Sequence, residues 1–279
     1  MSELVYIKNM KVDFFRDEEK IQIIKGIDLS MQKGEVLAIV GESGSGKSVT
    51  MKAMMGILPE NTAVNADEMK FDNVDLLSIG KKERRLLRGG EIAMIFQDPM
   101  TALNPLKTIG AHLTEVIKRH QKISTREARD MAITMLGKVG IPSAAKRMDQ
   151  YPHEFSGGMR QRVLIAMALC SHPKLLIADE PTTALDVTIQ AQILKLLKEL
   201  HETEDMDIIL ITHDLGVVAS IADRIAVMNN GEIVEEGTKE DVLYRPEHPY
   251  TKALIRAVPK SKKGVKERLI SLKDGENQK

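Results

Sequence analysis

The stretch Gly41-Glu42-Ser43-Gly44-Ser45-Gly46-Lys47-Ser48 follows an apolar run, Val36–Val40, and opens a segment with no helix breaker until Gly56. An apolar strand, a glycine-rich loop and a helix in this order, with the pattern G-x-x-x-x-G-K-[ST], are typical of a phosphate-binding loop. The glycines let the backbone turn tightly and aim several N–H groups inward, and the helix N-terminus adds partial positive charge. The loop therefore predicts a nucleoside triphosphate as the ligand.

The last two residues of this loop have the most specific predicted tasks. Lys47 is expected to reach the β- and γ-phosphates, and the Ser48 hydroxyl to complete the shell of a Mg²⁺ ion. The predicted nucleotide contacts comprise the whole loop: Gly41, Glu42, Ser43, Gly44, Ser45, Gly46, Lys47 and Ser48. We therefore expect a P-loop nucleotide hydrolase.

The overall composition argues against a nucleic-acid-binding protein. The 279 residues allow one large domain or two small ones, with ample material for a buried core. Lys and Arg together number 40, as do Asp and Glu, so no net charge attracts nucleic acid or an acidic substrate. Aromatic residues make up only 3% and tryptophan is absent, which argues against a base-stacking surface.

Cysteine content and apolar runs bear on the compartment. The single cysteine, Cys170, excludes an internal disulfide and a cysteine-based zinc site, and it fits a reducing cytosol. It lies in an apolar helical stretch, 163–170, and is expected to be a buried thiol. No segment approaches the roughly 20 apolar residues that span a bilayer, and the first residues do not resemble a secretory signal. We expect an intracellular chain that other proteins hold at any membrane where it works.

Apolar periodicity predicts strands first, then helices, and then strands alternating with helices. Strands are expected at 4–10, 21–29, 35–40, 68–71, 92–96, 175–178, 208–212 and 225–228. Helices are expected at 108–120, from the capping box Ser124-Thr125-Arg126-Glu127 to about 139, at 187–201 and at 250–258. This order indicates the α/β class, with a parallel core interrupted by a helical insert at about 103–165.

We assign residues 1–259 to one domain and residues 260–279 to a C-terminal basic tail. The tail carries Lys260, Lys262, Lys263, Lys266 and Arg268. A solvated tail and contact with anionic lipid headgroups both remain open for this run of charge.

A second group of chemically suggestive residues follows the insert. Ser156-Gly157-Gly158 opens a helix, so Ser156 can cap it and the glycine backbone can approach a phosphate. The apolar run 175–178 then ends in Asp179-Glu180, which suits Mg²⁺ on the first carboxylate and a general base at the second. Each feature alone is compatible with an ordinary helix start or loop start, but their occurrence together with the P-loop favours hydrolysis.

The order of the P-loop, Gln97, Ser156-Gly157-Gly158, Asp179-Glu180, Ala184-Leu185-Asp186 and His213 resembles the ATP-binding subunit of ABC transporters. The resemblance extends from about residue 5 to residue 258. It implies a P-loop ABC ATPase fold with a mostly parallel, RecA-like core, an N-terminal antiparallel β subdomain and an α-helical insert. Within this family, the sequence is most similar to the peptide and nickel importer branch, the oligopeptide and dipeptide permease ATPases. The segments that carry this closer resemblance are 96–105, 156–163, 179–192, 212–216 and 248–254. The last of these segments, which contains His248-Pro249-Tyr250, lies outside the residues of the ATPase chemistry.

The resemblance implies a role for each matched residue. Ser48, Gln97 and Asp179 are expected around Mg²⁺, directly or through water. The catalytic set is Glu180, which polarises the attacking water, His213, which contacts the γ-phosphate, and Gln97, which also faces a membrane subunit. The other histidines, such as His112 and His153, are expected to be surface or packing residues.

The resemblance also implies contacts to ATP from less obvious positions. Ser156, Gly157 and Gly158 are expected to touch ATP bound to a second subunit, with Asp186 at the same interface. An aromatic side chain ahead of the P-loop is expected to stack on adenine; Phe14 fits the register, and the adjacent Phe15 is the alternative.

The function implied by the resemblance is hydrolysis of ATP to ADP and phosphate, coupled to import across a bacterial-type cell membrane, at its cytoplasmic face. The expected partners are two membrane permease subunits, a second ABC ATPase that is a homologue rather than a copy, and an extracytoplasmic substrate-binding protein. Di- or oligopeptides are the favoured cargo and nickel or a metal-chelate is the alternative. The rival from another class is a soluble ABC-type ATPase that acts on ribosomes or DNA. Longer peptide-importer ATPases add a cysteine-rich iron–sulfur segment that this sequence lacks, so no cluster is expected.

Overall fold

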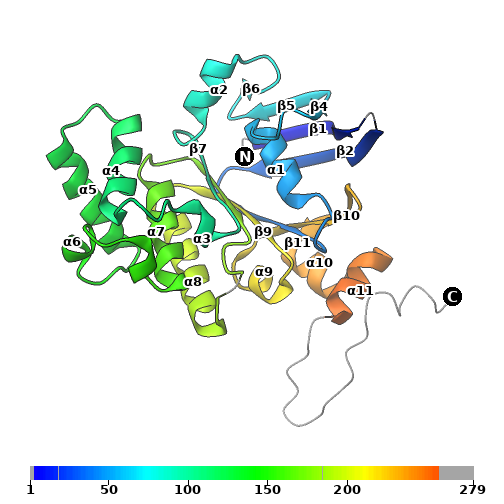
Figure 1. The fold of residues 1–279 in the computed structure, drawn as a ribbon. Coiled ribbons are helices and arrows are strands. Elements are labelled where there is room, and N and C mark those ends of the chain that lie inside the picture. Colours follow the sequence, from blue (N-terminus) through cyan, green and yellow to red (C-terminus); the bar gives the residue numbers. More distant parts are fainter. Residues whose placement is uncertain (1–2, 18, 184, 258–279) are drawn as a thin grey trace, which may run out of the picture. The chain divides into compact units, whose positions relative to one another are not determined.

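The structure is a computed structural model that describes residues 3–17, 19–183 and 185–257 (Figure 1). The chain divides into two compact units: the first comprises Met1–Ser78 and Leu210–Lys279, and the second comprises Ile79–Ile209. Among the described residues, no helix combines the length and the apolar character needed to cross a membrane. The basic tail predicted at 260–279 lies outside the described residues.

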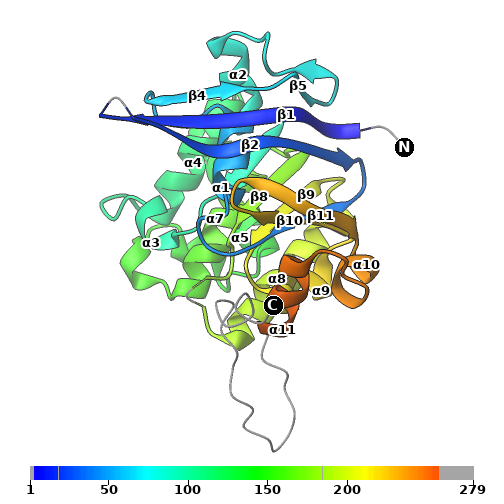
Figure 2. The same cartoon turned by 90° about the vertical axis from the view of Figure 1, so that its right-hand side faces the viewer.

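The first unit contains an antiparallel sheet dominated by two long strands, which Figure 2 shows side by side. Its strands are β1 (Glu3–Arg16), β2 (Glu19–Gln32), β4 (Thr62–Asn65), β5 (Glu68–Phe71) and β6 (Val74–Asp75). The order is β2-β1-β5-β6, with β4 also paired to β1. Val5 and Ile7 of β1 are buried, as expected for alternate side chains that share one face of a strand. Register shifts in the pairing with β2 follow Ile7 and Met10, and Met10 and Val12 are also buried. The predicted antiparallel β subdomain is therefore present, with longer strands than expected.

The first unit also holds the strand that leads into the P-loop. Strand β3 (Val36–Val40) pairs in parallel with β10 (Arg224–Asn229), which pairs antiparallel with β11 (Glu232–Thr238). The helices of this unit are α1 (Lys47–Met55), α9 (Leu215–Ile221), α10 (Lys239–Tyr244) and α11 (Pro249–Ala257). A buried core joins several of these elements through Ala38, Val40, Leu215, Val218, Ala222, Ile225, Val227, Val242 and Leu254.

The second unit is mainly helical. Strand β7 (Ile92–Ile95) pairs in parallel with β8 (Leu175–Asp179). Its helices are α2 (Lys81–Leu87), α3 (Pro99–Ala102), α4 (Ile109–His120), α5 (Thr125–Lys138), α6 (Ala144–Arg147), α7 (Gly157–Leu169) and α8 (Val187–Thr203), with a 3₁₀ turn at Pro152–Glu154. Helices α4, α5 and α7 pack together, as the green part of Figure 1 shows. Strand β9 (Asp207–Thr212) begins in this unit and ends in the first.

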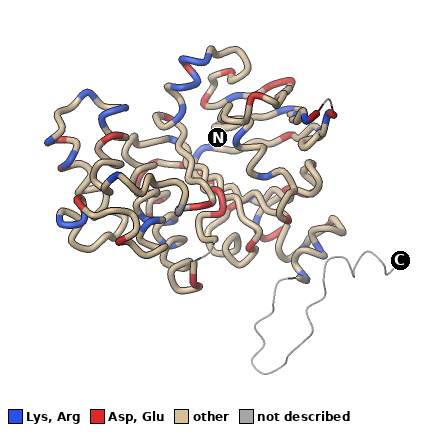
Figure 3. Tube along the Cα trace, in the orientation of Figure 1, with Lys and Arg blue, Asp and Glu red and all other residues tan. Residues whose placement is uncertain are grey.

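Helix starts in the insert follow the local capping rules. The predicted capping box is present: the Ser124 hydroxyl accepts the N–H of Glu127, and the Glu127 carboxylate accepts the N–H of Ser124. Thr108 caps α4 in the same way, by accepting the N–H of Ala111. Blue segments of Lys and Arg and red segments of Asp and Glu are both scattered over the described trace in Figure 3, which agrees with the balanced charge of the sequence.

Candidate functional site

The P-loop leaves a fully buried strand and turns through glycines with positive φ angles. All five residues of β3 are buried, and φ is 151° at Gly41, 85° at Gly44 and 107° at Gly46. A Cβ atom on Gly41 would lie 2.1 Å from the Met228 carbonyl oxygen, so only glycine fits there without a shift of backbone. The strand and the core beneath it thus determine the path of the loop.

Lys47 lies buried inside this loop at the first position of α1. Its ammonium group donates to the carbonyl oxygens of Gly41 and Glu42, both at 2.7 Å, and to the Ser45 hydroxyl at 3.3 Å. The N-terminus of α1 adds its partial positive charge at the same place. The half-buried Ser48 follows in the first turn and carries a hydroxyl. This concentration of positive charge and N–H groups is suited to a phosphate chain.

A residue outside the predicted site also contacts the P-loop. The Tyr250 hydroxyl, at the start of α11, accepts a hydrogen bond from the N–H of Glu42 at 3.0 Å. Burial raises the pKa of Tyr250 above its ordinary value. Residues 248–254 were expected to lie outside the ATPase chemistry, and the structure adds that Tyr250 contacts the backbone of the P-loop. No local pattern could have revealed the contact, because 208 positions separate the two residues.

In the second unit, Gln97 and Glu180 lie together at the ends of neighbouring strands. The parallel pairing of Ile95 with Ala178 brings the residues that follow β7 and β8 to the same edge. The Gln97 amide nitrogen donates to Glu180 Oε2 at 2.7 Å, and the Thr183 hydroxyl donates to the same oxygen at 2.8 Å. Two donors on one oxygen hold the Glu180 carboxyl group in a defined orientation.

The residues on either side of Glu180 complete this strand end. Asp179, the last residue of β8, is buried with 1% of its surface exposed. Glu180 itself has φ of 47°, in the left-handed region. An unusual backbone angle at a strand end directs the side chain away from the strand register, which is a frequent feature of functional sites.

Ser156 caps α7: its exposed hydroxyl accepts the N–H of Met159 at 3.4 Å. Of the two glycines that follow, Gly158 has a packing role, because a Cβ atom there would lie 2.5 Å from Cγ2 of Ile189, in α8. The space around Gly157 is less restricted. A Cβ atom there would have Cδ2 of Leu185 as its nearest neighbour, at 3.4 Å. Asp186 caps α8, where its carboxylate accepts the N–H of Ile189 at 3.0 Å. Ala184, part of the motif that contains Asp186, lies outside the described residues.

The remaining predicted residues belong to the first unit. Phe14 is half-buried in β1 opposite Ile21 and Thr62, whereas Phe15 points to the other face and is 45% exposed. His213 is exposed directly after β9, and the next residue, Asp214, caps α9. The first unit thus carries the P-loop, Phe14 and His213, and the second carries Gln97, Ser156, Gly157, Gly158, Asp179, Glu180 and Asp186.

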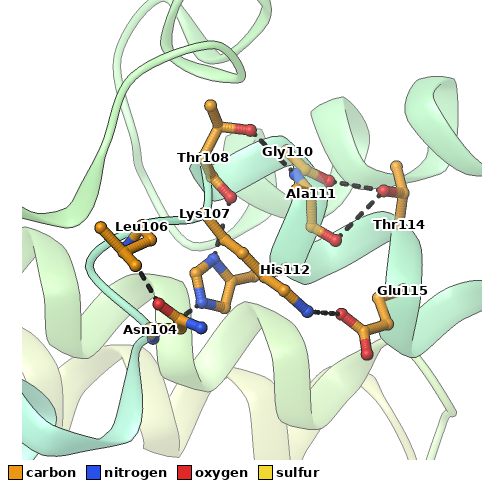
Figure 4. Close-up of polar contacts among 9 residues, drawn as sticks. All are labelled: Asn104, Leu106, Lys107, Thr108, Gly110, Ala111, His112, Thr114 and Glu115. Atoms are coloured by element: carbon orange, nitrogen blue, oxygen red, sulfur yellow. Dashed lines mark hydrogen bonds and ion pairs between the residues drawn. The ribbon is translucent and has the colours of Figure 1, made fainter.

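His112 organises the loop between α3 and α4, as Figure 4 shows. Its Nε2 accepts the N–H of Asn104 at 2.9 Å, so Nδ1 carries the hydrogen and donates to the Thr108 carbonyl at 2.9 Å. Asn104 also accepts the N–H of Leu106, whose side chain is 86% exposed. Of the two alternatives predicted for His112, a surface or a packing residue, the structure supports packing, because the side chain is buried and holds this loop.

The comparison with protein families decides the identity. The chain matches the family ABC transporter over residues 24–183 and the family Oligopeptide/dipeptide transporter, C-terminal region, over residues 234–277. The chain belongs to the ABC transporter family. It is an ABC ATPase, and the predicted family and enzyme class are confirmed.

Several curated relatives are about half identical to this ABC ATPase over the aligned residues. The dipeptide transport ATP-binding protein DppD of Bacillus subtilis (strain 168) is 53% identical over 261 residues, which cover 93% of this chain and 78% of the relative. The oligopeptide transport ATP-binding protein OppD of the same organism is 52% identical, with 98% and 76% covered. The DppD protein of Escherichia coli (strain K12) is 51% identical, with 96% and 82% covered.

Solved structures of ATP-binding cassettes confirm the predicted fold class. A dimeric, post-hydrolysis structure of the cassette MJ0796 bound to ADP and Pi has a TM-score of 0.75 at 29% identity. The alignment covers 84% of this chain and 98% of MJ0796. The cassette cbiO1 of Clostridium perfringens has a TM-score of 0.73 at 28% identity, with 88% and 92% covered.

Proposed function

We propose that this ABC ATPase drives the import of di- and oligopeptides, by hydrolysing ATP at the cytoplasmic face of a bacterial-type cell membrane. The observation that carries the proposal is the match of residues 234–277 to the C-terminal region of oligopeptide/dipeptide transporters. The dipeptide and oligopeptide transport proteins that are 51–53% identical support it. Nickel or a metal-chelate is the alternative cargo.

The P-loop residues are proposed to hold the triphosphate. Lys47 exchanges its bonds to the loop carbonyls for bonds to the β- and γ-phosphates, and the N–H groups of Gly44 to Ser48 bind the same oxygens. Gly41, Glu42 and Ser43 hold the shape of the loop beside them. Adenine stacks on Phe14, and His213 contacts the γ-phosphate.

The oxygen donors of Ser48, Gln97 and Asp179 are proposed as the Mg²⁺ ligands. A hydroxyl, an amide carbonyl and a carboxylate are the ligand types that this hard cation prefers, and Asp179 supplies the negative charge from a buried position. When bound, Mg²⁺ neutralises phosphate charge. In the described residues, no three His, Cys, Asp or Glu side chains gather as a further metal group.

Glu180 is proposed to act as the general base on the attacking water. The bonds from Gln97 and Thr183 keep its carboxylate oriented, as a positioned base requires. Because Gln97 is also the proposed contact to a membrane subunit, docking of that subunit can alter the orientation of the base. This single hydrogen bond thus offers a route from transport to hydrolysis.

The functional assembly is proposed to need several partners. Ser156, Gly157, Gly158 and Asp186 act on ATP held by a second ABC ATPase, which we propose to be a homologue. Two permease subunits form the transport path, and an extracytoplasmic binding protein delivers the peptide. Gly158 then has two tasks, since it also allows α7 to approach Ile189.

Uptake measurements test the cargo. In cells that lack this gene, uptake of a labelled dipeptide, a labelled pentapeptide and nickel is measured after complementation with wild type, Glu180→Gln or Glu202→Gln. Glu202 is an exposed residue of α8 and serves as the matched control. Wild type and Glu202→Gln are expected to restore peptide uptake, Glu180→Gln is expected to fail, and nickel uptake should be unchanged.

Two results would contradict the proposal. If nickel uptake depends on the gene and peptide uptake does not, the result would favour nickel or a metal-chelate as the cargo. A membrane-free pool bound to ribosomes, seen on fractionation, would favour the soluble ABC-type ATPase instead. Co-purification with two permease-like subunits in detergent would support the importer.

A further inference from the structure

The first peptide group of the P-loop is held at both ends. The Gly41 carbonyl oxygen accepts from Lys47 Nζ at 2.7 Å, and the N–H of Glu42, in the same peptide group, donates to the Tyr250 hydroxyl at 3.0 Å. A peptide group is planar, so bonds at its oxygen and its nitrogen determine the orientation of the whole plane. One of these two bonds is made by Lys47, which belongs to the P-loop itself, and the other by Tyr250 of α11.

The Tyr250 side chain is well placed to act as a fixed support. Its half-buried ring packs on the core that contains Val40, the last residue of the strand before the loop, and Leu254 of α11. Its backbone N–H donates to His248 Nδ1 at 3.2 Å. The hydroxyl is therefore directed at the loop by a ring that the core already holds.

A carboxylate on β11 holds the segment that precedes Tyr250. Glu235 accepts the N–H of Glu247 at 2.8 Å and the N–H of His248 at 3.0 Å, one on each oxygen. Burial works to raise the pKa of Glu235, but its hydrogen bonds, those two included, hold it below the ordinary value. The charged form of Glu235 therefore supports the start of α11 and, through it, the position of the Tyr250 hydroxyl.

We propose that Tyr250 is a positioning residue for ATP binding, because its hydroxyl holds the Gly41–Glu42 peptide group in the orientation that the P-loop needs. The inference rests on the proposed role of the P-loop in phosphate binding. When Lys47 turns from the loop carbonyls to the phosphates, the bond to Tyr250 continues to restrain this peptide group. The C-terminal region thereby takes part in forming the nucleotide site.

Binding measurements on the purified full chain test this role. Tyr250→Phe removes one oxygen atom and keeps the ring, so packing on the core is preserved. The dissociation constant for ATP is expected to rise about three- to tenfold, the effect of losing one hydrogen bond, while the thermal midpoint without nucleotide is unchanged. Tyr244→Phe is the matched control, because Tyr244 ends α10 with its side chain 77% exposed, and it should bind ATP like wild type.

A double variant separates positioning from general destabilisation. Glu235→Gln alone is expected to weaken ATP binding less than Tyr250→Phe. Once the Tyr250 hydroxyl is gone, adding Glu235→Gln should cause no further loss, because Glu235 acts through that hydroxyl. If the two substitutions raise the dissociation constant for ATP by factors that multiply in the double variant, Glu235 acts by another route. That result would overturn this part of the proposal.

Three outcomes have distinct meanings. Wild-type affinity in Tyr250→Phe, or a lower thermal midpoint with unchanged affinity, overturns the proposal, because the tyrosine then serves packing alone. Weakened binding at an unchanged midpoint supports it. If Lys47→Ala also binds ATP like wild type, the failure lies with the proposed role of the P-loop, and not with Tyr250 in particular.

Discussion

Gln97 donates a hydrogen bond of 2.7 Å to the carboxylate of Glu180, a residue 83 positions further along the chain. The bond joins the segment after β7 to the segment after β8, which the parallel pairing of these strands brings to one edge. Thr183 donates to the same oxygen from the turn that follows. The proposed base is therefore oriented by two neutral donors of its own unit, and one of them, Gln97, is also the proposed contact to a membrane subunit.

Replacement of Glu180 by glutamine should separate binding from hydrolysis. Glutamine has nearly the same shape, so the affinity for ATP is expected to stay within about twofold, whereas turnover should fall at least about hundredfold because the base is lost. Phosphate release and equilibrium binding of ATP measure the two effects, with Glu202→Gln as the control. A variant that hydrolyses ATP at the wild-type rate would exclude Glu180 as the base.

Replacement of Lys47 by alanine should weaken ATP binding itself. The substitution removes the buried ammonium group that the carbonyls of Gly41 and Glu42 now hold at the start of α1. We expect the dissociation constant for ATP to rise about ten- to hundredfold, the effect of losing charge-assisted bonds to phosphate. Titration with a fluorescent ATP analogue measures it, and Lys52→Ala, further along the same helix, should show little change.

Two glycine substitutions in the P-loop should differ in their cost. Gly44→Ala adds a methyl group into open space at φ of 85°, so it is expected to lower the free energy of unfolding by only about 1 kcal/mol of backbone strain. Gly41→Ala places the same methyl group 2.1 Å from the Met228 carbonyl oxygen. It should cost about 2 kcal/mol or more beyond Gly44→Ala, because backbone must move. Denaturant titrations compare the two, and equal losses would contradict this geometry.

Stability at high pH should depend on Cys170. Burial raises the pKa of this thiol to about 12 from an ordinary value of 9.0, so the folded chain keeps the proton that the unfolded chain releases above pH 9. The thiol therefore contributes stability that is fully present below pH 9 and is lost as the pH rises from 9 toward 12. The free energy of unfolding of wild type, relative to Cys170→Ala, should fall between pH 8 and pH 10.5. A constant difference across this range would show that the thiol ionises equally in both states.

Local sequence patterns predicted much of the backbone. The apolar run before Gly41 became a buried strand, and Ser124 and Glu127 formed the expected capping box, because both features depend on residues a few positions apart. Strand β11 was not predicted: Glu232–Thr238 is partly exposed and rich in glutamate, and its pairing with β10 depends on a partner strand. The short helices α2, α9 and α10 were missed for a related reason, since six or seven residues carry little periodicity.

Side-chain partners across the chain could not be predicted in the same way. Gln97 and Glu180 were both named as catalytic, but nothing in their surroundings showed that one donates to the other. Gly158 was expected to approach a phosphate. The structure adds a packing reason for glycine that the sequence does not display, because a Cβ atom at this position would lie 2.5 Å from Cγ2 of Ile189. Tyr250 was predicted to lie outside the ATPase chemistry, and its contact with the N–H of Glu42 became visible only in the structure.

The sequence by itself determined the loop from Gly41 to Ser48, its strand and its helix, and with them a protein that binds nucleoside triphosphate. Those features follow from backbone angles, apolar periodicity and helix-end charge, which act over a few residues. Only the tertiary structure decided that the N–H of Glu42 is held by Tyr250, because that bond requires the packing of α11 on the core beneath β3. Such contacts depend on the summed burial of many side chains, which no short segment encodes.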